Sequence, residues 1–217
     1  YTALGGIEAV ICTDVLQSFV LVAGAVLALV LIVLNIDGGL PALFSEAQVA
    51  GKFHAVEWGI NPALPVIWLV VLGNAFSNLY PYTADQTVVQ RYLTTSSAAA
   101  AGRAAWTNAL LTLPVTVLFF LVGTGLWVYF QHHPEQLDAS LQNDAILPLF
   151  VMHQFPMGLR GILIAGIFAA AMSSLDSSIN SMASVLINDY YRRFKRTVSE
   201  GEALWLARGL TLFFGLA

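Results

Sequence analysis

Residues 169–181 read AAAMSSLDSSINS, a run of small and hydroxyl-bearing side chains inside a long apolar segment. On an α-helix five of them share one face, an arc of roughly 100°: Ala170, Ser173, Ser174, Ser177 and Ser181. Asp176 and Asn180 flank one edge of this stripe. Hard cations prefer oxygen ligands, which hydroxyls, backbone carbonyls and a carboxylate supply. Small residues also line packed helix interfaces in membranes, so packing and cation binding both remain open here.

The composition of the whole chain is that of an integral membrane protein. Of its 217 residues, 58% are hydrophobic and 10% are charged, whereas a soluble domain carries about 25% charged residues. The net charge of −4 provides no basic surface, so we expect no nucleic-acid partner. The single cysteine, Cys12, excludes an intramolecular disulfide. The four histidines have no familiar zinc spacing, so we assign no metal-ligand cluster.

Four segments are long and apolar enough to cross a bilayer, which takes about 20 mostly apolar residues. We predict five helices, the last of them truncated, over residues 7–34, 62–91, 106–130, 159–190 and 203–217. They belong to a single partial transmembrane domain over residues 1–217. The chain begins at Tyr1 without an initiating methionine and stops inside an apolar run, so we expect both ends to be cuts from a larger parent.

Basic residues alternate between the connections that join these segments. The connections 35–61 and 131–158 are mainly acidic, whereas 91–103 carries two arginines and 191–202 carries three arginines and a lysine. Short cytoplasmic loops are enriched in lysine and arginine. We therefore expect the two basic connections and the N-terminal end of the chain to face the cytoplasm.

The second segment is unusual at its centre, where residues 73–86 read GNAFSNLYPYTADQ. One helix over residues 62–91 would be about 45 Å long, longer than the hydrocarbon layer of about 30 Å. Pro81 also removes a backbone donor, so we predict a helix broken near residues 78–84. Four side chains around the break are candidates for binding a small molecule: Asn74, Asn78, Tyr82 and Asp85. A proline kink without a binding role is the alternative.

Three acids fall inside the predicted spans: Asp14, Asp85 and Asp176. Ionisable groups are costly in hydrocarbon and usually face a protein interior or a watery cavity. No lysine or arginine lies deep enough to pair with all three, so a bound cation is one way to compensate them. Gln17 shares a helix face with Asp14, which leaves an interhelical hydrogen bond and cation binding both open for Asp14.

Three stretches resemble the sodium:solute symporter family, which includes sodium-coupled sugar, sialic acid, proline, iodide and monocarboxylate carriers. They are residues 5–17, GGIEAVICTDVLQ, residues 85–93, DQTVVQRYL, and residues 169–181. The resemblance implies an all-α integral membrane protein with a LeuT-like inverted-repeat transporter fold. The chain would cover core helices five to eight and the start of nine, with the segment 62–91 as the unwound helix six. We expect a multi-pass protein of a bacterial inner (plasma) membrane.

The resemblance also implies sodium ligands. Helix eight gives the family's main sodium site an alanine carbonyl and two serine hydroxyls, which match Ala170, Ser173 and Ser174. The remaining ligands belong to helix one, so the chain would hold about half of that site. Some members bind a second sodium ion, and its matching positions are Asp14, Ser173, Asp176 and Ser177.

The implied substrate contacts lie on the broken helix. In sugar carriers an asparagine of helix six touches the substrate, and an adjoining Tyr-Trp pair forms an inner gate. Asn78 matches the asparagine, whereas the pair reads Pro81-Tyr82. This departure from the sugar-carrier pattern is compatible with a sugar acid as the substrate.

The expected function is sodium-coupled secondary active symport of a small organic solute by alternating access, with a sugar or a sugar acid such as sialic acid favoured. Sodium is the coupling ion, and we expect no cofactor. We find no acid–base pair, metal motif or Ser/His arrangement at membrane depth, so we expect no enzyme. Two alternatives stay open. One is a proton-coupled or other-solute carrier of the same fold, for a monocarboxylate or an amino acid, in which Asp14 or Asp176 titrates. The other is the membrane sensor half of a receptor or kinase.

Overall fold

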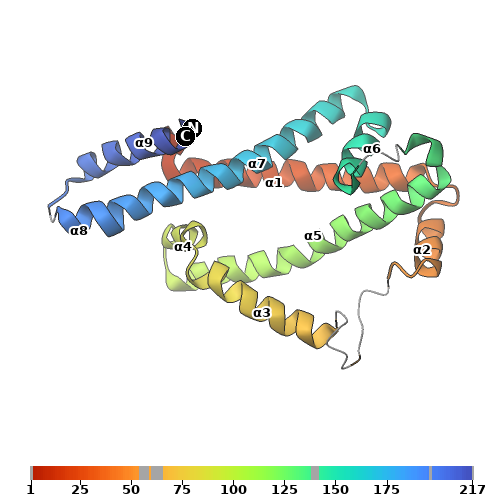
Figure 1. Cartoon of the computed structure of the whole chain (residues 1–217), viewed down its shortest axis with the longest axis horizontal. Coiled ribbons are helices and arrows are strands. Elements are labelled where there is room, and N and C mark those ends of the chain that lie inside the picture. The colour runs from red at the N-terminus through yellow and green to blue at the C-terminus, as the bar shows by residue number, and fades with distance from the viewer. Residues whose placement is uncertain (1, 54–58, 60–65, 138–141, 196, 217) are drawn as a thin grey trace. The chain divides into compact units, whose positions relative to one another are not determined.

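The computed structural model of the chain describes residues 2–53, 59, 66–137, 142–195 and 197–216, and these residues form helices and connections without a strand. The α-helices of this part, labelled in Figure 1, are α1 (Thr2–Leu34), α2 (Gly39–Val49), α3 (Ile67–Thr83), α4 (Gln86–Leu93), α5 (Ala98–His132), α6 (Ile146–Gln154), α7 (Met157–Val185), α8 (Arg192–Phe194) and α9 (Glu200–Leu216). Two short 3₁₀ turns lie at Pro134–Gln136 and Asn143–Ala145, and a π-helical stretch, Leu186–Tyr191, joins α7 to α8.

These elements fold into two compact units. The first unit comprises Tyr1–Ser18, Asn74–Ala105 and Ile167–Ala217, and the second comprises Phe19–Gly73 and Trp106–Gly166. Because α1, α5 and α7 are long, each of them contributes residues to both units.

Three helical stretches of the described chain are long and apolar enough to cross a membrane: Thr2–Leu34, Ala98–His132 and Met157–Phe194. They cover the predicted segments 7–34, 106–130 and 159–190. The second of them starts eight residues earlier than predicted, because the alanine run at its beginning has a high helix propensity. The first contains a kink at Gly6, whose φ of 57° and ψ of −148° lie outside the helical region.

The second predicted segment is interrupted, and the interruption lies at the C-terminal edge of the predicted region. Residues 62–65 of that segment lie outside the described residues. Helix α3 continues through Pro81 to Thr83, and the chain leaves the helical conformation at Ala84 and Asp85. Asp85 has an extended backbone (φ −71°, ψ 118°) and caps the next helix, α4, with its side chain. The N-cap residue therefore sets the break, and the proline is accommodated in the last turn of α3.

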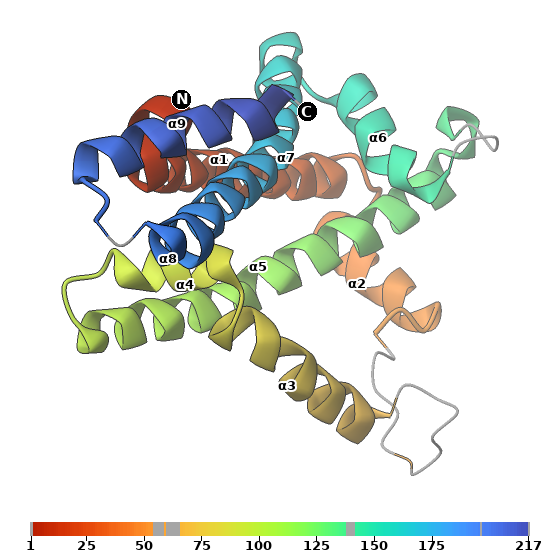
Figure 2. The ribbon, with the colours of Figure 1, turned by 60° about the vertical axis from the view of Figure 1, so that its left-hand side comes forward.

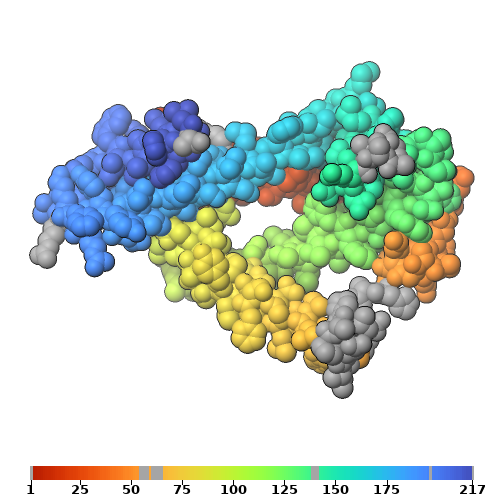
Figure 3. All heavy atoms as spheres, in the orientation of Figure 1, coloured from red at the N-terminus to blue at the C-terminus, as the bar shows by residue number. Residues whose placement is uncertain are grey.

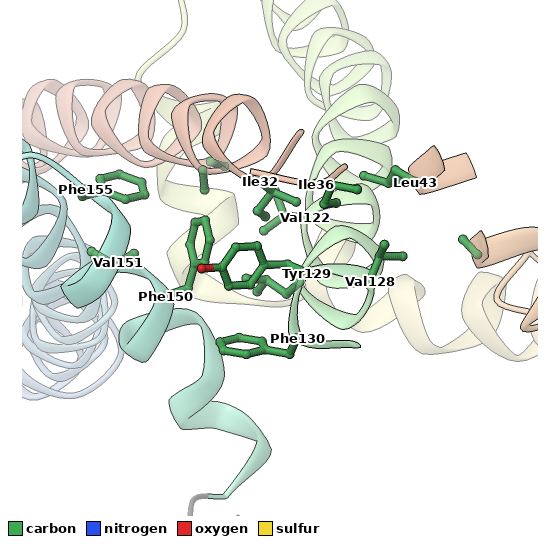
Figure 4. Close-up of a cluster of buried hydrophobic side chains, with 14 of the residues drawn as sticks. Ile32, Ile36, Leu43, Val122, Val128, Tyr129, Phe130, Phe150, Val151 and Phe155 are labelled. Atoms are coloured by element: carbon green, nitrogen blue, oxygen red, sulfur yellow. The ribbon is translucent and has the colours of Figure 1, made fainter. Parts of the chain in front are cut away.

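The second unit has an aromatic and aliphatic core in which α1, α2, α5 and α6 meet. Figure 4 shows ten of its side chains by name, among them Leu43 of α2, Tyr129 of α5 and Phe150 of α6. Tyr129 is 1% exposed, and its hydroxyl donates to Oε1 of Gln136 at 2.7 Å and accepts from Nε2 of Gln154 at 2.6 Å. This pairing satisfies the one polar atom of the ring at a buried position.

Helix α2 lies in the connection 35–61, for which the sequence predicted no helix. Its position depends on two positive-φ glycines, Gly38 (φ 88°) and Gly39 (φ 60°), which turn the chain after α1. Its buried residues Leu43 and Ala47 belong to the core of the second unit. Hydropathy did not indicate α2, because this amphipathic helix has only eleven residues and lies inside an acidic connection.

Candidate functional site

The first unit contains a polar pocket of about 470 Å³. Side chains of α1, α4 and α7 and of the break between α3 and α4 line it: Asp14, Ser18, Asp85, Thr87, Val88, Arg91, Ser173, Ser174, Ser177 and Ser178. Figure 2 shows α4 beside the blue C-terminal end of α7, and in Figure 3 the yellow-green atoms of α4 lie against the blue atoms of α7. The pocket therefore brings together three stretches that are distant in the sequence.

Asp14 of α1 is held from two sides. Its Oδ2 lies 2.6 Å from Nη2 of Arg91 on α4, and its Oδ1 accepts a hydrogen bond from the hydroxyl of Ser173 on α7. The same Nη2 of Arg91 donates to Oγ of Ser177 at 3.1 Å. Asp14 is 15% exposed and Arg91 is 44% exposed, so the ion pair is half open to solvent. Ser173 thus contacts the carboxylate of this ion pair, and Ser177 contacts its guanidinium.

Arg91 changes one expectation from the sequence. The sequence left a bound cation as one way to compensate the three acids, because no basic residue appeared deep enough to pair with all of them. For one of the three, Asp14, the structure adds another way, since Arg91 forms an ion pair with it. The interruption at Ala84 and Asp85 starts a separate helix, and this helix carries Arg91 to the carboxylate.

Asp85 is a helix cap that also lines the pocket. Its Oδ1 accepts from the backbone N–H of Thr87 at 2.8 Å and from the Thr87 hydroxyl at 2.6 Å. Both bonds stabilise the first turn of α4, whose N–H groups have no partners inside the helix. The structure thus places Asp85 with Asp14 and the α7 serines, whereas the sequence grouped it with three substrate candidates.

Those three candidates, Asn74, Asn78 and Tyr82, are exposed on α3 and are not among the residues that line the pocket. The side-chain amide of Asn78 donates to the backbone carbonyl of Asn74, one turn earlier, at 2.8 Å. That contact keeps Asn78 against its own helix. In the first unit, polar residues of the broken helix therefore lie in two places. The α3 side chains form one set, and the residues that line the pocket beside Asp85 form the other.

On α7 the predicted stripe divides into two sets. Ser173, Ser174 and Ser177 line the pocket, whereas Ala170 and Asp176, both half-buried, do not. Within the part of the chain that the structure describes, Oδ2 of Asp176 is buried without a hydrogen-bond partner. The family resemblance implies that Asp176 and Asp14 share one ion; in the structure Asp14 lines the pocket, whereas Asp176 is not among its lining residues.

A second contact joins α4 to α7. Nδ2 of Asn180 donates to Oε1 of Gln90 at 2.9 Å, one residue before Arg91. Sequence reasoning missed Gln90, Thr87 and Arg91 as members of the site. Their spacing at i, i+3 and i+4 puts them on one helical face, and this spacing within residues 85–93 is the signal that could have found them.

The chain is similar to known proteins over its whole length. It matches the model of the sodium:solute symporter family over residues 1–216. It is 40% identical over 198 residues to the sodium/sialic acid symporter SiaT of Proteus mirabilis, which covers 91% of this chain and 40% of that protein. It is 39% identical over 220 residues to the sodium/sialic acid symporter NanT of Aliivibrio fischeri, which covers 100% of this chain and 43% of that protein. The chain thus spans less than half the length of either relative.

A solved structure agrees with the fold. It is described as the substrate-bound outward-open state of a Na⁺-coupled sialic acid symporter with a novel Na⁺ site, and it superposes with a TM-score of 0.88 at 36% identity over 100% of this chain and 46% of that one. The predicted all-α, LeuT-like transporter fold is confirmed by this match and by the helical architecture. The chain belongs to the sodium:solute symporter family, a family of integral membrane transporters.

Proposed function

We propose that the protein containing this chain is a sodium-coupled symporter of a sugar acid of the sialic acid class. The relatives at 40% and 39% identity, both named as sodium/sialic acid symporters, support this class of substrate. The observation that carries the proposal is the convergence of Asp14 with Ser173 and Ser177 on one polar pocket of the first unit. A carboxylate beside hydroxyl groups is a ligand set suited to a hard monovalent cation.

The proposed sodium ligands fall into two groups. Ala170, Ser173 and Ser174 would form the α7 half of a main site, which needs further ligands from outside this chain. Asp14, Ser173 and Ser177 would hold a second ion. Asp176 is kept as a candidate for that ion, although it lies outside the pocket. Its buried and unpartnered oxygen is compatible with a ligand role in the whole protein.

The proposed substrate region is the broken helix formed by α3 and α4. Asn74, Asn78 and Tyr82 would meet the solute, because amide and phenol groups bind the hydroxyls of a sugar. Asp85 stays with them as a candidate through its position at the break. Broken helices of transporters place binding groups near the bilayer midplane, where both faces of the membrane can be reached in turn.

Transport would run by alternating access, driven by the sodium gradient. Moving one elementary charge across 100 mV is worth about 2.3 kcal/mol. At that potential each sodium ion would supply this electrical energy in addition to the free energy of its concentration gradient. The N-terminal end of the chain would face the cytoplasm of a bacterial inner membrane, as the basic connections indicate.

The full-length protein in proteoliposomes provides the experiment. Uptake of labelled sialic acid, sugars, monocarboxylates and amino acids is measured with an inward sodium gradient, and with potassium in its place. We expect sialic acid to accumulate only with sodium, and Ser174→Ala to raise the sodium concentration for half-maximal uptake by about tenfold, the equivalent of one ligand worth about 1.4 kcal/mol.

Ser178→Ala is the matched control. Ser178 lines the same pocket, but its hydroxyl donates to the backbone carbonyl of Ser174 at 2.8 Å and it is not a proposed ligand. We expect its sodium dependence to match that of the wild type. Uptake that ignores sodium and follows a pH gradient would replace this proposal with a proton-coupled carrier. Absence of uptake for every solute would favour a sensor.

A further inference from the structure

Arg91 contacts Asp14 and Ser177, two of the residues proposed above as sodium ligands. Its Nη2 lies 2.6 Å from Oδ2 of Asp14 and 3.1 Å from Oγ of Ser177. We propose that Arg91 is a built-in competitor of the coupling ion: its guanidinium holds Asp14 and Ser177 in the ion-free protein and must leave before sodium binds them. This inference rests on the proposed function, because it needs Asp14 and Ser177 to be sodium ligands.

The two cations exclude one another at this place. A calcium ion, which is close to sodium in size, lies about 2.3–2.6 Å from its oxygen ligands. A sodium ion bound to Oδ2 of Asp14 would therefore stand where the guanidinium nitrogen now lies. Two positive charges that close repel strongly, and the repulsion grows as water is excluded. Binding of sodium and pairing with Arg91 are thus alternatives for the same carboxylate.

The charge of the pocket fits one exchangeable cation. Its lining contains two carboxylates, Asp14 and Asp85, and one basic group, Arg91. Oδ1 of Asp85 already accepts two hydrogen bonds from Thr87, so Asp14 is the carboxylate with which a new cation would pair. Among the described residues, Asp14 keeps the hydrogen bond from the Ser173 hydroxyl when Arg91 leaves, and a hydroxyl is a poor substitute for a positive charge.

The surroundings of Arg91 favour its release. Its side chain is 44% exposed and lines a polar pocket. Its helix, α4, has eight residues and is separated from α3 at Asp85. A second side-chain contact of α4 with α7 is the bond between Gln90 and Asn180. Sodium binding therefore removes one contact between α4 and α7 and loosens the second half of the broken helix.

The competition has a calculable effect on affinity. Apparent affinity falls by the fraction of molecules that are competent to bind. If Arg91 pairs with Asp14 in about nine of ten ion-free molecules, the apparent sodium dissociation constant is about tenfold weaker than that of the free site. Removal of the guanidinium should therefore strengthen sodium binding, whereas removal of a purely structural ion pair should weaken it.

The experiment measures binding of radioactive ²²Na⁺ to the purified full-length protein in nanodiscs, at constant ionic strength. We expect Arg91→Gln to lower the sodium dissociation constant by roughly three- to tenfold. Arg91→Lys keeps the charge but loses the forked donor geometry of the guanidinium. Its sodium dissociation constant should lie between those of the wild type and Arg91→Gln. Arg103→Gln, at an exposed arginine of the same unit outside the pocket, is the control and should bind as the wild type does.

The outcomes separate this inference from the proposed function. An unchanged or raised dissociation constant in a folded Arg91→Gln protein overturns the competition. Sodium binding by Asp14→Asn that equals the wild type would show that the ion site itself is wrong, whatever residue 91 does. If Arg91→Gln does not fold, a spin-label pair at Leu93→Cys and Leu175→Cys, both exposed, reports on α4 with Arg91 intact. Replacing potassium by sodium should shift the distance between the labels, and an unshifted distance contradicts the proposal.

Discussion

Gln90 of α4 and Asn180 of α7 lie side chain to side chain, with 2.9 Å between Oε1 and Nδ2. Both residues are half-buried. A hydrogen bond of this kind contributes about 0.5–1.5 kcal/mol to stability. In a double-mutant cycle of Gln90→Ala and Asn180→Ala, we expect a coupling energy in this range, measured from thermal unfolding of the purified protein.

Asn35→Ala is a suitable reference for that cycle. Asn35 directly follows α1, and its exposed side-chain amide donates to the carbonyl of Leu31 in that helix at 2.8 Å. Its removal should not couple to Gln90→Ala, because residues without shared partners have additive effects. A cycle that shows the same coupling for Asn35 and Asn180 would refute the bond between α4 and α7.

Substitution of Asp85 should separate its capping role from a role in binding substrate. Asp85→Ala removes an N-cap and should cost about 1 kcal/mol, whereas Asp85→Asn keeps an acceptor and most of that stability. Thermal unfolding of the two variants measures the difference. If the carboxylate charge contacts the solute, Asp85→Asn will keep its stability and still lose substrate affinity. Equal losses of stability in both variants would argue against the cap.

Gly125 of α5 should tolerate no side chain. A Cβ at this position would lie 2.9 Å from Cγ2 of Ile32 and 3.2 Å from Cδ1 of Leu43, inside the core of the second unit. Overpacking of this kind costs about 1–3 kcal/mol. Gly123 lies in the same helix, and a Cβ added there would have no described atom within 4 Å. The expected effect of Gly123→Ala is therefore the stabilisation that comes from higher helix propensity. In thermal unfolding, Gly125→Ala should therefore have a lower melting temperature than the wild type, and Gly123→Ala should have an equal or higher one.

The contact between Lys195 and Glu202 should make stability depend on pH. Their atoms Nζ and Oε1 lie 2.5 Å apart, and the hydroxyl of Tyr191 donates to the same oxygen at 2.5 Å. The hydrogen bond from Lys195, followed by that from Tyr191, holds the pKa of Glu202 below its usual value of 4.5. The bond to Glu202 likewise raises the pKa of Lys195 above 10.5.

The signs of these two shifts define the pH window. A lowered carboxyl pKa gives stability that is present above 4.5 and is lost as pH falls through the folded value. A raised lysine pKa gives stability that is present below 10.5 and is lost as pH rises through the folded value. Melting temperatures of wild type and Glu202→Gln should therefore differ most between these limits and converge towards low pH. A difference that is constant down to pH 3 would contradict this assignment.

The apolar length and the polar stripe of α7 were visible in the sequence because they are local. Ser173, Ser174 and Ser177 were predicted as one face, and they line one pocket. The partner of Asp14 was not visible, since Asp14 and Arg91 are separated by 77 positions in the sequence, and no spacing rule covers that separation. The break before α4 lies at the C-terminal edge of the predicted region 78–84, because the side-chain cap of Asp85 sets it, whereas Pro81 was the local signal in the sequence.

Helix α4 is only eight residues long, and isolated helices shorter than about 12–15 residues are marginal in water. The cap at Asp85 and the contacts with α1 and α7 stabilise its two turns, so we expect α4 to open before the rest of the first unit. In amide hydrogen exchange, the N–H groups of Val89 to Leu93 should exchange faster than those of α7. Whatever releases Arg91 and Gln90 thus also melts the helix that carries them.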